Sequence, residues 1–206
     1  ELGLGNDIIE DAKRAAKLSK ADLVTKMVVE FTELQGTMGA IYAQNSGENQ
    51  RVAEAIKEQY LPKGASSDLP KSVIGILLSI ADKMDSIVGL YAIEKYVTGS
   101  KDPFGLRRAA LGIINIILEN GIDVDLRKLI SEALLVYTEV NALAFDYDTT
   151  LDKTLAFIKD RLKNKLLDDG YRYDIVNAVV DTNNTNILRM SEKVKAVTAF
   201  IDENET

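Results

Sequence analysis

Residues 98–121 read TGSKDPFGLRRAALGIINIILENG, and this stretch contains the clearest helix signal of the chain. Asp102 followed by Pro103 predicts a helix start, because the Asp side chain can accept from unpaired N–H groups and Pro suits the first helical position. Apolar residues then recur at helical spacing as far as Leu118. Arg107 and Arg108 stand near the start of this helix, where the positive end of the helix dipole gives a cation no advantage. Their presence needs another explanation.

A helical wheel gives the two arginines different surroundings. At about 100° per residue, Arg107 falls inside the apolar arc and Arg108 falls on the polar side. In the earlier stretch VIGILLSIADKMDSIVGLYAI (73–93), the same arithmetic places Asp85 within the apolar arc. A charge in apolar surroundings needs a partner. We therefore expect Arg107 to form a structural ion pair with Asp85, or failing that with Asp82, and we expect Arg108 to face solvent or a partner.

Working outward, apolar residues recur at helical spacing through most of the chain, and no segment keeps the period of two that is typical of a strand. We therefore predict an all-α protein. The YVTGSKDP segment (96–103) is the best boundary between two domains, 1–98 and 99–206. Gly36 and Gly39 are expected to permit a close approach of helices or a kink. The expected helical segments are 7–34, 49–60, 71–96, 103–119, 126–144, 149–168, 171–181 and 189–202.

Composition limits the possible functions. The 206 residues are 46% hydrophobic, which is enough for a core, and no stretch has the roughly 18 charge-free apolar residues of a membrane span. With 32 acidic and 25 basic residues the net charge is −7, the opposite of a module that holds nucleic acid mainly by itself. The chain lacks an initiator Met and a secretory pattern, and we interpret it as an internal part of a longer chain.

The absence of His and Cys excludes most familiar catalytic chemistry. Histidine is the usual proton shuttle near neutral pH and, with Cys, a frequent ligand of transition metals. The chain contains neither residue, and it lacks a phosphate-binding G-x-x-x-x-G-K-[ST] loop. The lack of Cys also fits a reducing cytoplasm. We therefore predict no catalytic residues, no metal site and no cofactor in this chain.

Four blocks in consecutive order carry a resemblance to a known family. They are KADLVTKMVVEFTELQGTMGAIYA (20–43), EAIKEQYLPKGASSDLP (54–70), IADKMDSIVGLYAI (80–93) and GSKDPFGLRRAALGII (99–114). These blocks resemble the β subunit of the bacterial heterotetrameric glycyl-tRNA synthetase. The remainder is similar to the helical region that precedes the anticodon-binding domain in that family.

The resemblance implies a part of a ligase that charges tRNA with glycine at the expense of ATP. In this family the α subunit holds the active site, with ATP and Mg²⁺, and the β subunit binds tRNA. The implied partners are tRNA(Gly) and the α subunit in an α2β2 assembly, in the cytoplasm and away from membranes. A helical protein-interaction module without enzymatic role is the alternative that the acidic composition leaves open.

The resemblance also implies that residues 1–98 form a degenerate relative of the HD phosphohydrolase domain. Its paired His-Asp matches Ala21 and Asp22, and its later Asp matches Asp82. Because the histidines are missing, two carboxylates alone would bind a transition metal weakly. We therefore expect Asp22 and Asp82 to cap or bridge helices, with residual metal binding as the alternative.

Basic side chains are the remaining candidates for tRNA contact. Two basic runs, KDRLKNK (159–165) and the segment from Arg189 to Lys195, are usually solvated helix faces, and phosphate contact is the alternative. For Arg107 the alternative to an ion pair is likewise a phosphate contact. The candidate tRNA-binding residues are Lys101, Arg108, Arg161, Lys163, Lys165, Arg189 and Lys193.

Overall fold

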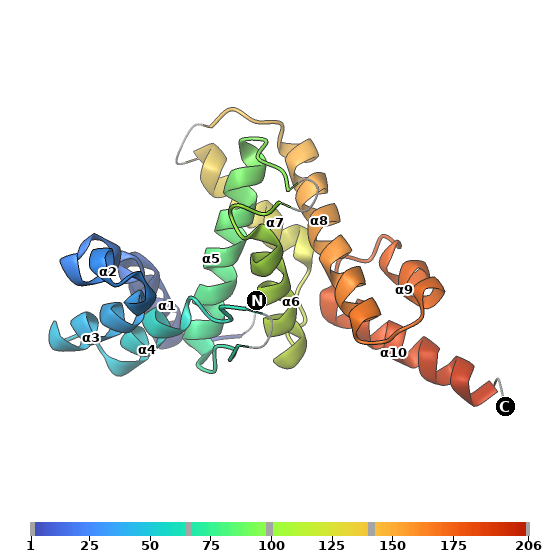
Figure 1. Ribbon diagram of the computed structural model, residues 1–206, viewed down its shortest axis with the longest axis horizontal. Helices are drawn as coiled ribbons and strands as arrows, with labels where there is room; N and C mark the ends of the chain where they lie inside the picture. Colours follow the sequence, from blue (N-terminus) through green and yellow to red (C-terminus); the bar gives the residue numbers. More distant parts are fainter. Residues whose placement is uncertain (1–2, 65–66, 98–100, 140–142, 205–206) are drawn as a thin grey trace. The chain divides into compact units, whose positions relative to one another are not determined.

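A computed structural model describes residues 3–64, 67–97, 101–139 and 143–204, and these residues are helical almost throughout (Figure 1). The pairing of Asp125 with Asn186 is an isolated β-bridge, and no strand occurs in the described ranges. The all-α prediction is confirmed. The chain divides into two compact units, Glu1–Asp82 and Lys83–Thr206, and the division falls within helix α5 (Val73–Ala92). The boundary expected between residues 98 and 99 lies outside the described residues.

Unit 1 is built from short helices packed through small side chains. It contains α1 (Asn6–Leu18), η1 (Ala21–Val24), α2 (Lys26–Glu30), η2 (Thr32–Leu34), α3 (Thr37–Asn45), α4 (Gln50–Glu58) and the start of α5. Alanines allow α1, α3 and α4 to approach closely, and larger side chains fill the space between them. The buried cluster consists of Ala15, Ala40, Ala43, Val52, Ala53, Ala55, Ile56, Ile74 and Leu78.

The structure corrects the expectation of one helix over 7–34. Helix α1 ends at Leu18, and Ser19 Oγ donates to the carbonyl oxygen of Ala16 at 2.9 Å. Thr25 then caps α2, because its Oγ1 accepts from Val28 N at 3.4 Å. Such local hydrogen bonds of Ser and Thr compete with a continuous helix. The apolar spacing that suggested one helix therefore belongs to several short elements.

Asp22 caps a helix that begins much later in the chain. Its Oδ2 accepts from Gly36 N at 2.7 Å and from Gly39 N at 3.0 Å, at the N-terminus of α3. Gly36 has a φ of +77°, and a Cβ on Gly39 would stand 2.8 Å from Ile56 Cγ2. The close approach expected at these two glycines is confirmed. Helix α3 itself was not among the expected segments, because the carboxylate that completes its first turn is distant in sequence.

Glu58 holds the residues just before α5, and Ser72 caps that helix, because Ser72 Oγ accepts from Gly75 N at 3.0 Å. Glu58 Oε1 accepts from Lys71 N at 3.0 Å, and its Oε2 accepts from Ser72 N at 3.0 Å and from Ser72 Oγ at 2.6 Å. Gly75 lies against this carboxylate, since a Cβ there would be only 2.0 Å from Glu58 Oε2. The buried acid thus fixes the start of the long helix.

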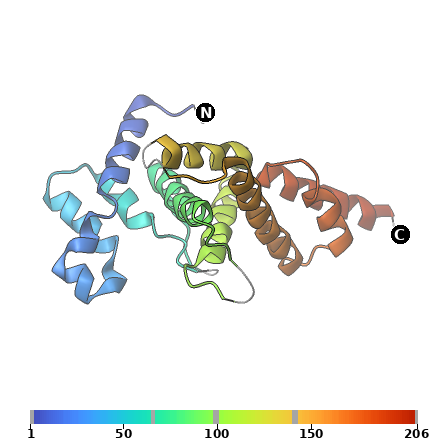
Figure 2. The same ribbon diagram turned by 90° about the horizontal axis from the view of Figure 1, so that it is seen from above.

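Unit 2 is a helical assembly in which α8 contacts most of the other helices. It contains the rest of α5 together with α6 (Leu106–Glu119), α7 (Leu126–Glu139), α8 (Tyr147–Asp168), α9 (Tyr173–Val180) and α10 (Ile187–Asn204). Helix α8 packs against α6, α7, α9 and α10, and the two views agree on the place of α9 and α10 beside it (Figures 1 and 2). Helix α6 supplies four fully buried isoleucines, Ile113, Ile114, Ile116 and Ile117.

The start of α6 differs from the sequence-based expectation. The helix begins at Leu106, after a turn that contains Pro103 and Phe104, rather than at Pro103. Asp102 Oδ1 accepts from Leu106 N at 2.8 Å, and its Oδ2 accepts from Arg107 N at 2.9 Å. The carboxylate caps the helix as predicted, but it reaches across the turn to do so.

We expect Asp22→Ala to destabilise unit 1, because it leaves the buried N–H groups of Gly36 and Gly39 without an acceptor. The expected decrease in the free energy of unfolding is about 1 to 3 kcal/mol, measured by urea denaturation. Glu33→Ala, which removes an exposed acid on η2, is the matched control and should change stability by less than about 0.5 kcal/mol. Equal shifts for the two variants would contradict a capping role for Asp22.

Candidate functional site

The two carboxylates at the degenerate HD positions are engaged in protein contacts. Asp22 is 2% exposed and caps α3, while Asp82 Oδ1 lies 2.5 Å from Lys20 Nζ. Ala21, at the position of the missing histidine, is exposed. Burial, followed by the charges of Asp22 and Asp82, raises the pKa of Tyr60 to about 12. Both acids therefore serve the packing of unit 1, as expected, whereas the likeness of this unit to an HD domain stays a prediction.

Metal binding finds little support in this region. Asp22 has one oxygen committed to the two glycine N–H groups, and its Oδ1 is buried without a hydrogen-bond partner among the described residues. No group of three or more acidic side chains is arranged as metal ligands in the described ranges. The absence of a metal from this chain stays a prediction.

The basic run on α8 points toward the protein's own acids. Lys163 Nζ lies 2.5 Å from Asp181 Oδ1, and Lys165 Nζ lies 3.0 Å from Asp169 Oδ2. Arg161 pairs with its neighbour Asp160. The side chains of Arg161, Lys163 and Lys165 are each only about a quarter exposed. These cations are therefore partly buried and paired with surface acids of unit 2, so only part of each side chain faces solvent.

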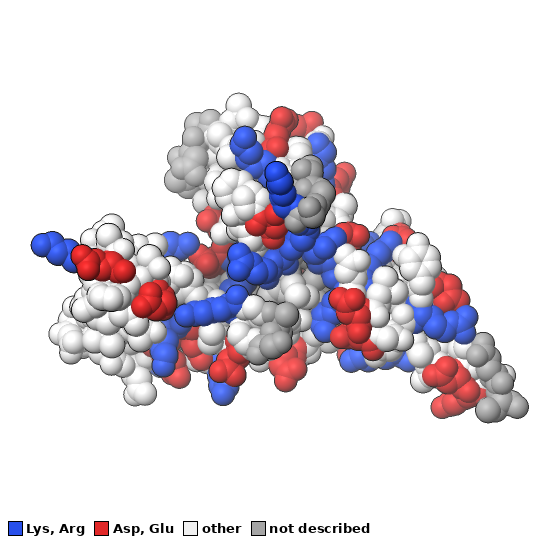
Figure 3. All heavy atoms as spheres, in the orientation of Figure 1, with Lys and Arg blue, Asp and Glu red and all other residues white. Residues whose placement is uncertain are grey.

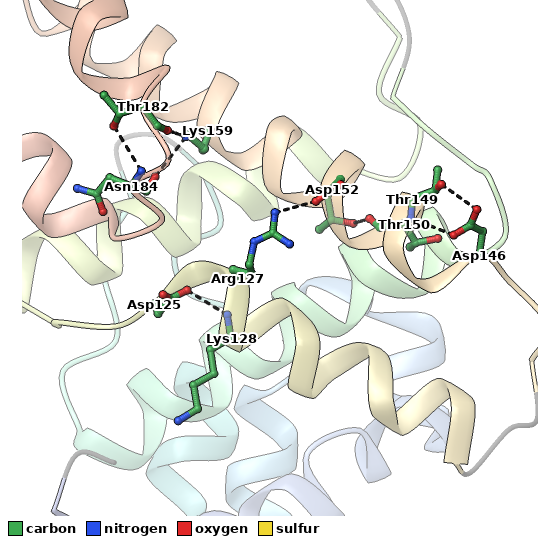
Figure 4. A network of polar contacts seen from close by, with 11 residues as sticks. Asp125, Arg127, Lys128, Asp146, Thr149, Thr150, Asp152, Lys159, Thr182 and Asn184 are labelled. Carbon is green, nitrogen blue, oxygen red and sulfur yellow. Dashed lines mark hydrogen bonds and ion pairs between the residues drawn. The ribbon is translucent and has the colours of Figure 1, made fainter.

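Lys159 fixes the loop between α9 and α10. Its Nζ donates to the carbonyl oxygens of Thr182 at 2.7 Å and Asn184 at 3.2 Å (Figure 4). Desolvation by burial lowers the pKa of Lys159. Close to this loop, Arg127 of α7 is directed at Asp152 of α8, with 2.7 Å between Nη2 and Oδ1. This network joins α7, α8 and the α9–α10 loop.

The second basic run is only partly paired. Arg189 Nη2 lies 2.7 Å from Asp123 Oδ2, and hydrogen bonds from Arg189 and Asn186 lower the pKa of Asp123. Lys193 and Lys195 are exposed on α10. Within the described part of the chain, no acid pairs with Lys193. Of this run, Lys193 is thus better placed than Arg189 to meet an external phosphate.

The turn before α6 carries the other exposed cations. Lys101 and Arg108 are exposed, as predicted for Arg108, and Phe104 between them is 59% exposed. The guanidinium of Arg108 lies over Gly105, since a Cβ there would be 2.9 Å from Arg108 Nη2. Arg107 is half-buried, and its Nη1 donates to the carbonyl oxygen of Lys101 at 3.3 Å.

Asp85 does not lie in the apolar surroundings that the helical wheel predicted. It is exposed, and its Oδ1 accepts from Tyr137 Oη at 2.8 Å. The helical wheel misplaced Asp85 because this side of α5 faces solvent and α7. The sequence of α5 alone does not show which other helix packs against it. The ion pair of Arg107 with Asp85 stays a prediction.

Charges of both signs mix on the surface. Figure 3 shows Lys and Arg side chains gathered over the region of α6 and α8, with Asp and Glu side chains among them. Sequence reasoning missed three features: the exposed Phe104, the contact of Tyr137 with Asp85, and the loop contact of Lys159. Only Phe104 had a local signal, because an aromatic residue between Pro and Gly stands in a turn.

These features define an all-helical protein in which several acids cap helices, others pair with cations, and two of the exposed cations flank an aromatic turn. Comparison with known sequences identifies its family. A family model described as "Glycyl-tRNA synthetase beta subunit" matches residues 2–181. The chain belongs to this family.

Three relatives carry the name glycine–tRNA ligase beta subunit. The relative from Clostridioides difficile is 46% identical over 95% of this chain and 28% of its own length. Those from Desulforamulus reducens and Ectopseudomonas mendocina are 45% and 44% identical, over 97% and 92% of this chain and 29% and 27% of their own lengths. The chain thus spans between a quarter and a third of the length of these relatives. Among the described residues, no helix is long and apolar enough to cross a membrane.

We expect Lys159→Ala to loosen the α9–α10 loop, because the carbonyl oxygens of Thr182 and Asn184 are left without a charged donor. The free energy of unfolding should fall by about 1.5 to 3 kcal/mol, and amide exchange in residues 181–186 should quicken. Lys195→Ala, on the exposed face of α10, is the control and should have little effect. Unchanged exchange in the loop of the Lys159 variant would refute this role.

Proposed function

We propose that this chain is a non-catalytic, tRNA-binding and scaffold portion of the β subunit of glycine–tRNA ligase. The observation that carries the proposal is the family match, which extends over both units. The chemistry of the side chains supports it. The chain contains no His or Cys. The two acids at the proposed HD positions, Asp22 and Asp82, are engaged in a cap and an ion pair, which leaves them poorly suited to general acid–base or metal chemistry.

The same proposal assigns the catalytic step to other parts of the enzyme. ATP and Mg²⁺ are used by the α subunit, which joins the β subunit in an α2β2 assembly in the cytoplasm. The substrate that this chain meets is tRNA(Gly). Its contribution to affinity is modest, because the net charge of −7 opposes the approach of a polyanion.

Among the candidate cations, Lys101, Arg108 and Lys193 support the tRNA role best. All three are exposed, and within the described residues none of their side chains pairs with an acid. The other four candidates are each paired with an acid of this chain and would have to leave it to bind a phosphate. They are Arg161, Lys163, Lys165 and Arg189. We therefore assign phosphate contact first to the exposed three.

A protein-interaction role is the second candidate, and one surface of unit 1 favours it. Val24 is 85% exposed, Val29 is 64% exposed and Phe31 is 49% exposed, all on η1, α2 and the residue that follows. Apolar side chains gathered in this way are typical of contact with another protein surface. A module that binds only protein would associate with the α subunit and leave tRNA affinity unchanged when its exposed cations are removed.

We expect the double variant Lys101→Gln, Arg108→Gln of the complete synthetase to bind tRNA(Gly) more weakly than the parent. In a titration over a range of salt concentrations, the slope of log K against log salt should become less steep by about 0.7 to 0.9 for each phosphate that the variant no longer neutralises. Lys13→Gln, on the exposed face of α1, is the control for removal of positive charge. An unchanged slope in the double variant, with intact association of the two subunits, would favour the protein-interaction module.

A further inference from the structure

An open groove of about 530 Å³ in unit 2 has an apolar part and a polar end. The volume lies in the range of small-ligand sites. Neither the sequence motifs nor the proposed phosphate contacts account for it. The side chains on which the argument rests come from α5, from α7 and from the turn before α6, namely Asp85, Ser86, Leu90, Ile93, Phe104 and Tyr137.

The apolar part of the groove presents an aromatic ring to solvent. Phe104 is 59% exposed and Ile93 is 48% exposed, so both retain apolar surface that a bound group could cover. The turn that holds Phe104 is fixed by Asp102, whose carboxylate accepts from the first N–H groups of α6. The backbone around Phe104 is therefore held at the start of α6, and its exposed ring is available for stacking.

The polar end of the groove holds a carboxylate in a fixed place. Tyr137 Oη donates to Asp85 Oδ1 at 2.8 Å and rests on Gly89, where a Cβ would stand only 2.3 Å from the hydroxyl. Burial, together with this hydrogen bond, raises the pKa of Tyr137. The hydroxyl thus remains a donor to Asp85, whose oxygens can accept further hydrogen bonds from a ligand.

Two exposed cations stand close to Phe104 in sequence. The guanidinium of Arg108 lies over Gly105, the residue after Phe104, and Lys101 precedes Phe104 by three residues. The N-terminal amides of α6 are not a rival anion site, because Asp102 already occupies them. Arg108 and Lys101 are therefore the cations nearest in sequence to the ring that an anionic group could use.

We propose that this groove binds one unpaired nucleotide of RNA, with the base on Phe104 and its phosphate at Arg108 and Lys101. An aromatic ring beside cations is the combination that binds unstacked bases together with their backbone. The carboxylate of Asp85 sets the orientation, because it repels phosphate and accepts hydrogen bonds from an amino group on a base edge. Cytosine, adenine and guanine carry such a group, and uracil does not. The inference rests on the proposed tRNA role and assigns it a particular site.

The test uses the complete synthetase with tRNA(Gly), in the parent and in Phe104→Ala and Phe104→Trp variants. Because stacking contributes about 1 to 3 kcal/mol per base, the affinity of Phe104→Ala for tRNA should fall by about five- to a hundredfold. Phe104→Trp should retain the affinity of the parent. Phe200→Ala, which removes a ring 66% exposed on α10, is the matched control and should leave affinity unchanged. Melting temperatures should be equal, since both rings are exposed.

Competition identifies the bound group. A short oligocytidylate should displace tRNA from the parent more effectively than an abasic ribose phosphate of equal length, and this difference should disappear in Phe104→Ala. If tRNA binding responds to Lys101→Gln, Arg108→Gln but not to Phe104→Ala, the nucleotide site is refuted while the tRNA role stands. If neither variant affects tRNA binding, both proposals fail. If Phe104→Ala weakens only the association with the α subunit, the groove is a protein interface instead.

Discussion

The fold depends on carboxylates that complete the first turns of helices. Each helix start leaves backbone N–H groups without acceptors and carries the positive end of the helix dipole, so a negative side chain placed there is favoured on both counts. Asp22 does this for α3, Asp102 for α6 and Asp146 for α8. Glu58 acts one step earlier, because it binds Ser72, the residue whose hydroxyl caps α5. Asp22 and Glu58 are buried and act across long sequence separations. Asp22 thus holds α3, a helix of nine residues that would be marginal by itself.

The acids of this chain serve different purposes, so its excess of negative charge is not spread evenly over its cations. Acids that cap helices do not neutralise lysines or arginines, as Asp102 illustrates beside Lys101 and Arg108. Elsewhere acids and bases pair within unit 2, as Lys163 does with Asp181. Net charge is therefore a poor guide to where an anionic ligand can bind. Where an anionic ligand can bind depends on which acids already accept hydrogen bonds or pair with cations within the protein.

The two acids at the proposed HD positions both make structural contacts. Asp22 accepts hydrogen bonds from glycine amides, and Asp82 pairs with Lys20. A carboxylate is costly to bury unless it is paired or hydrogen-bonded. The contacts of Asp22 Oδ2 and of Asp82 offset part of that cost.

The sequence alone determined the helical class, the cap at Asp102, the solvent-facing Arg108 and the absence of histidine and cysteine chemistry. Each of these depends on composition or on residues within a few positions of one another, where periodicity and capping act locally. Only the tertiary structure decided the partner of Asp85 and the internal role of Lys159. These depend on which residues of distant segments meet, as Tyr137 meets Asp85 and Thr182 meets Lys159. Long polar side chains can satisfy their charge in several directions, so the packing of the helices, rather than the local pattern, selects the partner.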